Sequence, residues 1–252
     1  MLLTDLYQLT MLQAYARAGM NGTAVFELFV RRLPPTRNFL LAAGLEQALQ
    51  FLQGARFTRD EIDWLAHCGR FDKSFVRDLA DWRFGGDVWA VPEGTPVFGG
   101  EPLLRVVAPI AQAQIVETRL INLLQLPTLV ASKAARCVLA APRKLLIDFG
   151  LRRAHGAEAG LLSARAAYLA GFAGTATVAA GQAWDIPLFG TMAHSYVQAC
   201  GDEKAAFRNY AEAFPAASAV LIDTYDSLAA ARKVVELARE GVNIGAVRID
   251  SG

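Results

Sequence analysis

Polar and charged residues gather at the ends of four short apolar segments in the second half of the chain. These segments are residues 145–149, 187–189, 220–222 and 245–249, and each leads into a polar turn. Helical patterns separate the segments, and this alternation is typical of a parallel β/α arrangement. Because the carboxyl ends of parallel strands meet at one edge, we expect the polar residues to share a site.

The first of these turns offers an aromatic ring and two guanidinium groups. Phe149 is followed closely by Arg152 and Arg153. A guanidinium group donates two parallel hydrogen bonds to a carboxylate or a phosphate, so the turn suits an anionic substrate. The alternative is a cluster of surface salt bridges, which runs of arginine commonly form.

The second turn carries two hydroxyl groups and an imidazole. Thr191, His194 and Ser195 lie in the segment Gly-Thr-Met-Ala-His-Ser. A histidine in this position can act as a general base, a metal ligand or an acceptor of a phosphoryl group. The alternative is a structural histidine that only completes a hydrogen bond of the fold.

The last two turns supply carboxylates. Asp223 follows one segment, and Asp250 and Ser251 follow Arg248 in the other. Such acids hold Mg²⁺ with water, orient ribose hydroxyl groups or balance arginines, and the alternative for them is helix capping. Together with the arginines and the histidine, they predict a site for an anionic, phosphate-bearing substrate.

The elements that position these residues predict an α/β fold. Residues 1–109 mix helical patterns with alternating apolar strands and read as an α+β domain. Residues 110–141 form a helical connection that Pro127 is expected to interrupt. Residues 142–252 read as a β/α barrel that is incomplete, because the chain stops at the end of a strand. A shortened chain, an incomplete gene prediction and a partial barrel all remain open.

Composition limits the classes of partner. The chain has 252 residues, with 25 Lys+Arg against 24 Asp+Glu, so it lacks the basic excess that nucleic acid or an anionic membrane favours. The apolar segment 166–184 is rich in Ala, Gly and Thr and makes a poor membrane span. Three scattered cysteines and an N-terminus without a secretory pattern predict a cytoplasmic protein with reduced thiols.

The ordered set of motifs resembles nicotinate phosphoribosyltransferase. The resemblance implies an N-terminal α/β domain, an irregular β/α barrel and a homodimer that shares its active sites. It also implies the joining of nicotinate to 5-phosphoribosyl 1-diphosphate, with Mg²⁺ and coupled ATP hydrolysis, on the route to NAD. The matching segments are residues 4–11, 26–29, 37–40, 148–153, 190–195, 223–225 and 248–252.

The resemblance also implies roles for single residues. Tyr7 of the neighbouring subunit and Phe149 sandwich the pyridine ring, and His194 is the histidine that ATP phosphorylates. The resemblance also implies that Asp250 is a catalytic residue that lies at the ribosyl substrate. It implies that other residues bind substrate or support the site, and no metal ligand is assigned. The substrate-binding residues are Arg152, Thr191, Arg248 and Ser251, and the supporting residues are Asp5, Arg153, Ser195 and Asp223.

Two alternatives remain beside this function. Nicotinamide phosphoribosyltransferase has an aspartate in a Gly-Thr-Asp-Thr-Val-Ala segment, where this chain has Ala176, so nicotinate is favoured. The family continues beyond the last motif into phosphate-binding loops that this sequence lacks. The second alternative is therefore a non-catalytic fragment that keeps the dimer surface.

Overall fold

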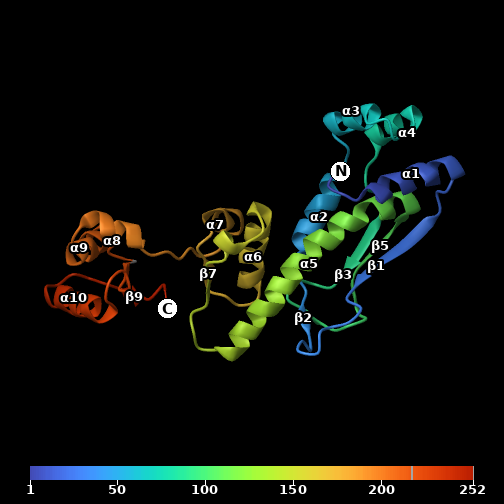
Figure 1. The fold of residues 1–252 in the computed structure, drawn as a ribbon. Helices are drawn as coiled ribbons and strands as arrows, with labels where there is room; N and C mark the ends of the chain where they lie inside the picture. The colour runs from blue at the N-terminus through green and yellow to red at the C-terminus, as the bar shows by residue number, and fades with distance from the viewer. Residues whose placement is uncertain (217, 252) are drawn as a thin grey trace. The chain divides into compact units, whose positions relative to one another are not determined.

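The structure is a computed structural model that describes residues 1–216 and 218–251. It divides into two units, Met1–Leu188 and the part of the chain from Phe189 onward. Figure 1 colours the first unit from blue to gold and the second in orange and red. The division at residues 109 and 142 that the sequence predicts is a different one and stays a prediction.

An antiparallel sheet begins the first unit. Its strand order is β1 (Thr23–Phe29), β5 (Pro102–Pro109) and β3 (Asp87–Ala90), so the last strand in sequence lies in the middle. A smaller antiparallel pair joins β2 (Leu40–Leu41) to β4 (Pro96–Val97). In β5, buried and exposed residues largely alternate, as expected when one face of a sheet covers a core.

The longest element is the helix α5 (Ile110–Ala140), which packs against α1 (Leu6–Ala18) and α2 (Leu45–Gly54) (Figure 1). By length and composition alone, α5 is long and apolar enough to cross a membrane. Its apolar residues are used inside the fold, because Ile115 and Val116 lie in the core that α5 shares with the sheet. The packing therefore accounts for part of its hydrophobicity, since 39% of its most apolar stretch is buried.

The helix α5 is continuous through Pro127, so the predicted interruption is wrong. Proline cannot donate the hydrogen bond that the carbonyl of Leu123 would accept in a regular helix. The backbone of Gly44 packs against this carbonyl, since a Cβ at Gly44 would lie 2.2 Å from the Leu123 oxygen. Next to the proline, the Thr128 hydroxyl donates to the Ala43 carbonyl at 3.1 Å. Tertiary contacts thus hold the helix where its own hydrogen bond is missing.

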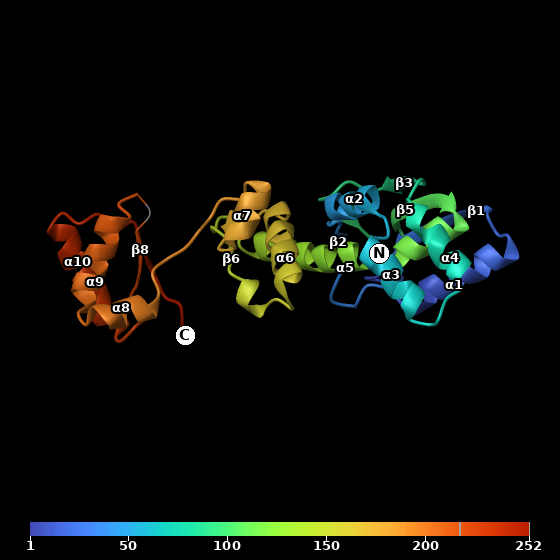
Figure 2. The same cartoon turned by 90° about the horizontal axis from the view of Figure 1, so that it is seen from above.

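The rest of the first unit adds helices around this core and a second, parallel strand pair. β6 (Ile147–Asp148) pairs with β7 (Gly174–Thr175), and Thr175 forms a further parallel bridge with Leu188. Figure 2 shows α6 beside α5 from above. The remaining helices are α3 (Arg59–His67), α4 (Lys73–Asp78), η1 (Leu79–Asp81), η2 (Leu151–Arg153), α6 (Ala157–Leu169) and α7 (Val178–Trp184).

A largely buried ion pair ties α6 to the start of α2. Arg165 donates to Glu93 at 2.8 Å and also pairs with Glu46. Glu93 accepts the backbone N–H groups of Gly44 and Leu45 at 2.6 and 3.1 Å. Burial acts to raise the pKa of Glu93, but the hydrogen bonds and charge of Arg165 outweigh it and lower that pKa.

We expect Glu93→Ala to lower the free energy of unfolding by about 3 kcal/mol, because it leaves buried donors unpaired. The matched control is Glu27→Ala, which removes the exposed partner of Arg105 and should cost about 0.5 kcal/mol. Urea unfolding of both variants measures the difference. Equal losses in the two variants would contradict the importance of the buried pair.

The second unit contains the parallel strands β8 (Ala219–Leu221) and β9 (Ala246–Arg248). Its helices are α8 (His194–Cys200), α9 (Glu203–Ala213) and α10 (Ser227–Arg239). Their apolar faces and β8 enclose a separate core; its fully buried members are Val197, Ala206, Phe207, Val220, Leu221, Ala230 and Leu237.

The fold is therefore a mixed α/β arrangement. The predicted α+β half has its antiparallel sheet, and the second half has the predicted parallel strands alternating with helices. Within residues 1–216 and 218–251 the parallel strands form two separate pairs and do not close into a barrel.

Candidate active site

The carboxyl ends of β8 and β9 form the centre of the candidate site. The two strands are parallel, so Asp223 after β8 lies beside Asp250 and Ser251 after β9. Asp223 Oδ2 accepts the backbone N–H groups of Asp250 at 2.8 Å and of Ser251 at 2.7 Å, and the Ser251 hydroxyl at 2.8 Å. The Asp223 carboxylate thus fixes the turn that follows β9.

Asp223 does not cap the following helix. The cap of α10 is Asp226, whose carboxylate accepts the N–H of Ala229 at 2.7 Å. The Oδ1 atom of Asp223 is buried and has no hydrogen-bond partner among the described residues. A buried carboxylate oxygen left open in this way is available to a cation or a donor group.

His194 stands over these carboxylates at the start of α8. Its Nδ1 lies 3.0 Å from the Thr224 hydroxyl, and its Nε2 lies 3.7 Å from Asp250 Oδ2 and 3.9 Å from Asp223 Oδ1. The side chain is 33% exposed. One ring nitrogen is therefore held by the protein, while the other faces two carboxylates at a position that a ligand can reach.

Arg248 joins the same cluster from the end of β9. Its Nη1 donates to the Thr191 hydroxyl at 3.1 Å, and its Nη2 pairs with Asp250 Oδ1. A guanidinium held at two points presents a fixed charge beside His194, as recognition of a carboxylate or phosphate needs. Ser195, by contrast, is exposed, and within the described part of the chain its hydroxyl has no hydrogen bond in this cluster.

The hydrogen bonds to Asp223 predict an acid-sensitive turn. The N–H of Ser251 is the largest cause that lowers the pKa of Asp223, which falls from 3.8 to about 2. A lowered pKa contributes stability above the unfolded value of 3.8, and that contribution is lost as the pH falls toward 2. We expect Asp223→Asn to flatten this part of the stability profile.

Thermal unfolding of the parent protein and of Asp223→Asn between pH 5 and pH 2 measures this effect. The transition to follow is that of the unit from Phe189 onward. The matched control is Glu212→Gln, which changes an exposed carboxylate on α9 of the same unit. If the control and Asp223→Asn lose stability over the same pH range as the parent protein, the turn does not depend on the ionised carboxylate.

In the first unit, the turn after β6 holds Phe149. Asp148 Oδ1 accepts the N–H of Gly150 at 3.0 Å, and its Oδ2 accepts the Thr175 hydroxyl at 2.7 Å. The N–H of Ala176 donates to the Asp148 carbonyl at 2.8 Å. The start of the Phe149 turn is therefore fixed against the segment that contains Ala176.

Arg152 and Arg153 follow in η2, and both are exposed. Neither forms a salt bridge with any residue of 1–216 or 218–251, so the surface salt-bridge alternative is not observed there. Arg153 lines a hollow of about 590 Å³ together with Asn122 and His155. The two guanidinium groups are accessible to an anionic ligand.

Asp5 and Tyr7 lie at the start of α1. Asp5 Oδ2 accepts the Thr118 hydroxyl at 2.9 Å, and the Tyr7 hydroxyl donates to Glu117 at 3.2 Å. Both partners belong to α5. The ring of Tyr7 is 47% exposed, so it offers a flat apolar surface at the edge of the unit.

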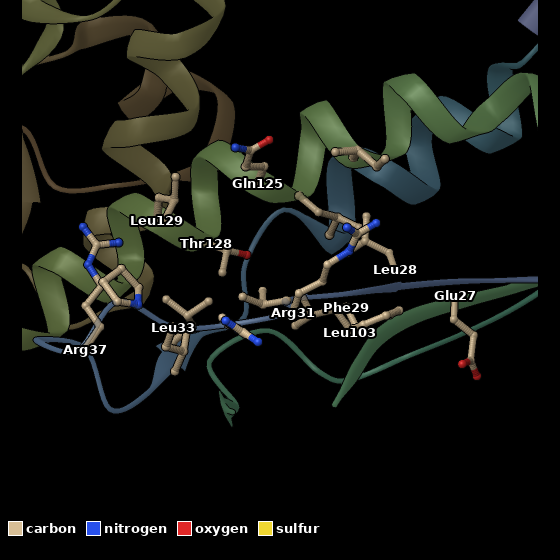
Figure 3. A pocket seen from close by; sticks show the side chains of 16 residues that line it. Glu27, Leu28, Phe29, Arg31, Leu33, Arg37, Leu103, Gln125, Thr128 and Leu129 are labelled. Carbon is tan, nitrogen blue, oxygen red and sulfur yellow. The ribbon is translucent and has the colours of Figure 1, made fainter. Parts of the chain in front are cut away.

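A separate cavity of about 460 Å³ lies between α5 and the segment after β1. Figure 3 shows leucines on its walls, with Arg31 and Arg37 among its polar residues. None of the site residues predicted from the sequence lines it.

The comparisons with known proteins cover nearly the whole chain. Residues 2–125 match the N-terminal domain of nicotinate phosphoribosyltransferase, and residues 145–252 match the nicotinate phosphoribosyltransferase family. The chain belongs to the nicotinate phosphoribosyltransferase family. The cluster at β8 and β9 and the Phe149 turn both lie in the second matched region.

Similar relatives come from several organisms. The chain is 50% identical over 254 residues to a nicotinate phosphoribosyltransferase of Mycobacterium tuberculosis, covering 100% of the chain and 55% of the relative. It is 40% identical to the Bacillus subtilis enzyme, covering 99% and 52%. The human nicotinic acid phosphoribosyltransferase structure is 36% identical, with a TM-score of 0.88, covering 100% and 61%. The chain therefore spans about half the length of the curated relatives it matches.

Sequence reasoning missed two hydroxyl groups in this member of the family. The Thr224 hydroxyl is hydrogen-bonded to Nδ1 of His194, and the Thr175 hydroxyl donates to the Asp148 carboxylate. Both residues sit at strand ends, beside residues that drew attention through their charge. Position at a strand end is the signal that was present for them, since a threonine there presents a hydroxyl to the same edge.

Proposed function

We propose that this protein acts as a nicotinate phosphoribosyltransferase, joining nicotinate to 5-phosphoribosyl 1-diphosphate with coupled ATP hydrolysis. The products are nicotinate mononucleotide and diphosphate, on the route to NAD. The observation that carries the proposal is the cluster of Thr191, His194, Asp223, Arg248 and Asp250 in a chain of this family. A histidine, an arginine and two carboxylates at one sheet edge suit transfer between charged substrates.

Several parts of this proposal concern the whole enzyme. Relatives are almost twice as long as this chain, so we assign the remaining strands of an irregular β/α barrel to the rest of such a protein. The same holds for part of the 5-phosphoribosyl 1-diphosphate site. We further propose a cytoplasmic homodimer in which Tyr7 reaches the site of the neighbouring subunit.

The pyridine ring is proposed to bind between aromatic rings, and its carboxylate at an arginine. Phe149 supplies one ring and Tyr7 of the neighbour the other, and each stacked pair contributes on the order of 1 kcal/mol beyond burial. Arg248 and Thr191 hold the carboxylate of nicotinate. Transfer requires that the ring nitrogen then faces the ribosyl carbon.

Ribosyl transfer depends on charge more than on a strong base. The bond between the ribosyl carbon and the diphosphate breaks as the pyridine nitrogen forms its own bond there, and positive charge develops on the sugar. Asp250 stabilises that charge, Ser251 binds the sugar, and Arg152 with Arg153 holds phosphate oxygens.

The carboxylates fit the Mg²⁺ that the family resemblance implies. Mg²⁺ prefers oxygen ligands, and Asp223 Oδ1 is a buried carboxylate oxygen without a hydrogen-bond partner among the described residues. Like Asp250 Oδ2, it lies within 4 Å of His194 Nε2. Among residues 1–216 and 218–251 there is no group of three metal-ligating side chains, so Asp223 and Asp250 would hold the ion together with oxygens from outside the protein. When bound, the ion neutralises the departing diphosphate.

His194 is proposed to couple ATP hydrolysis to this transfer. In this proposal Nδ1 donates its N–H to the Thr224 hydroxyl, 3.0 Å away, and Nε2 carries the lone pair that attacks the terminal phosphorus of ATP. The bond from that phosphorus to ADP breaks as the N–P bond forms, and water later takes the phosphoryl group. Asp223 and Asp250 orient the imidazole during both steps.

The choice of nicotinate over nicotinamide rests on Ala176. The N–H of Ala176 donates to the carbonyl of Asp148, directly before Phe149. The side chain of Ala176 cannot accept a hydrogen bond from an amide. We expect Ala176→Asp to lower kcat/KM for nicotinate by about 100-fold, because a carboxylate there repels the acid. A parallel assay with nicotinamide checks this, and an unchanged preference would contradict the assignment.

The test of the function is the formation of nicotinate mononucleotide by the purified protein. The reaction contains 5-phosphoribosyl 1-diphosphate and Mg²⁺, with and without ATP, and nicotinamide replaces nicotinate in the control. We expect product from nicotinate and a higher rate with ATP. Product from nicotinamide alone would favour the amide enzyme, and a folded protein that binds nicotinate without product would favour a non-catalytic fragment.

A further inference from the structure

The interface between α1 and α5 contains polar side chains where an apolar contact is the usual solution. Gln8 is fully buried although its neighbour Tyr7 is exposed, and Gln114 is 8% exposed. Leu9 and Leu12, also on α1, belong to the hydrophobic core nearby. Buried amides are costly unless they are hydrogen-bonded, so their presence here needs a reason beyond packing.

The buried amides form one network that ends on Tyr7. Gln8 Nε2 donates to the Tyr7 hydroxyl at 2.8 Å and to Glu117 Oε2 at 3.2 Å. Gln114 Nε2 donates to Gln8 Oε1 at 2.6 Å and to Glu117 Oε2 at 3.0 Å. The Tyr7 hydroxyl donates to Glu117 Oε1 at 3.2 Å. The oxygen of Tyr7 is therefore both a donor and an acceptor inside the protein.

This hydrogen-bonding pattern is unusual for a surface tyrosine. Tyr7 is nearly half exposed, yet its hydroxyl forms two hydrogen bonds within the protein. Two hydrogen bonds at the hydroxyl hold its oxygen in place, and with it the direction of the long axis of the ring. The O–H prefers to lie in the plane of the ring, so its bond to Glu117 also favours one orientation of that plane.

We propose that Glu117, with Gln8 and Gln114, is a positioning group that fixes the ring of Tyr7 for stacking against the pyridine ring of the substrate. The inference rests on the proposed function, because it takes nicotinate as the stacked ligand. A ring fixed before binding loses less conformational freedom when the ligand arrives, so the network acts on affinity.

The charge state of the network agrees with this role. Burial, followed by the negative charge and hydrogen bond of Glu117, raises the pKa of Tyr7. Asp5 adds a smaller effect in the same direction. The hydroxyl therefore keeps its proton at neutral pH and continues to donate to Glu117.

The first experiment separates positioning from folding by steady-state kinetics. Glu117→Leu removes the acceptor and should raise KM for nicotinate about 10-fold, with kcat and KM for 5-phosphoribosyl 1-diphosphate within about twofold. Glu117→Gln keeps an acceptor and should restore KM to within about threefold. Glu212→Leu makes the same change on an exposed face of α9 and should have no effect.

Tyr7→Phe gives a second variant, at an exposed position, that keeps the ring and removes its tether. It should raise KM for nicotinate as Glu117→Leu does. Both changes remove the hydrogen bond between Tyr7 and Glu117, so the double variant should show no further rise. Additive effects, or equal rises in KM for both substrates, would overturn the proposal.

A measurement without turnover distinguishes failure of the proposal from failure of the function. NMR of protein labelled at the tyrosine Cζ carbon, assigned with Tyr7→Phe, should show a Tyr7 signal that shifts on addition of nicotinate. The shift should be lost at the same nicotinate concentration in Glu117→Leu. Product formation with a nicotinate KM unchanged in Glu117→Leu overturns the positioning role alone, whereas no product and no shift in the parent protein overturn the function and, with it, the proposed ligand.

Discussion

Replacing His194 with alanine is expected to abolish the stimulation of nicotinate mononucleotide formation by ATP and to leave a slower basal reaction. Nε2 is the ring nitrogen that Thr224 does not hold, and alanine supplies no atom to accept the phosphoryl group. In the proposed mechanism, ribosyl transfer itself depends on the arginines and carboxylates, which remain in this variant. Initial rates with and without ATP measure the effect, and their ratio should fall to about one.

The matched control for this variant is His67→Ala. His67 ends α3, and its Nδ1 lies 2.6 Å from the Asp63 carbonyl, far along the chain from the strand ends. It should keep full stimulation by ATP. Stimulation that survives in His194→Ala would show that another group accepts the phosphoryl group, or that none does.

Replacing Arg248 with alanine is expected to raise KM for nicotinate about 100-fold. A charge-assisted hydrogen bond contributes about 1.5–3 kcal/mol, and loss at the upper end of this range corresponds to that factor. The change also removes the bonds to Thr191 and Asp250, so the loop before His194 loses a contact. Steady-state kinetics with varied nicotinate measures it.

Two comparisons sharpen the test of Arg248. Arg239→Ala removes an exposed guanidinium from the last turn of α10 and should leave KM unchanged. Arg248→Lys keeps the charge but not the planar pair of donors, so it should recover only part of the affinity. A normal nicotinate KM in Arg248→Ala would exclude this arginine as the carboxylate ligand.

The proximity of Asp223 to Asp250 and Ser251 was predictable from the sequence. Each follows a short apolar segment, and parallel pairing brings the ends of such segments to one edge whatever the details of the helices between them. The sequence pattern was sufficient there because the geometry of a parallel pair is nearly constant. The presence of His194 in the same cluster does not follow from this rule, because the predicted strand at 187–189 forms, among the described residues, only a bridge from Leu188 to Thr175 and is not paired with β8 or β9.

The continuous helix at Pro127 and the network around Tyr7 were not predictable in this way. Proline locally predicts a break, and only the approach of Gly44 from elsewhere in the chain compensates for it. Gln8 and Glu117 look like ordinary surface residues of two helices until those helices pack. Contacts between residues far apart in sequence decide both features, and local patterns do not contain them.

The strand order of the first sheet has a consequence for synthesis of the chain. The central strand β5 is made last, and the ion pair of Glu27 with Arg105 joins residues 78 positions apart. At a synthesis rate of about 5–20 residues per second, about 4–16 s pass between the synthesis of β1 and that of its partner strand β5. During that time its apolar residues have no sheet to join, and Glu27 is the one charge among them. A charge inside an apolar strand disfavours its pairing with other chains, so we expect this carboxylate to matter more for the nascent strand than for the stability of the finished protein.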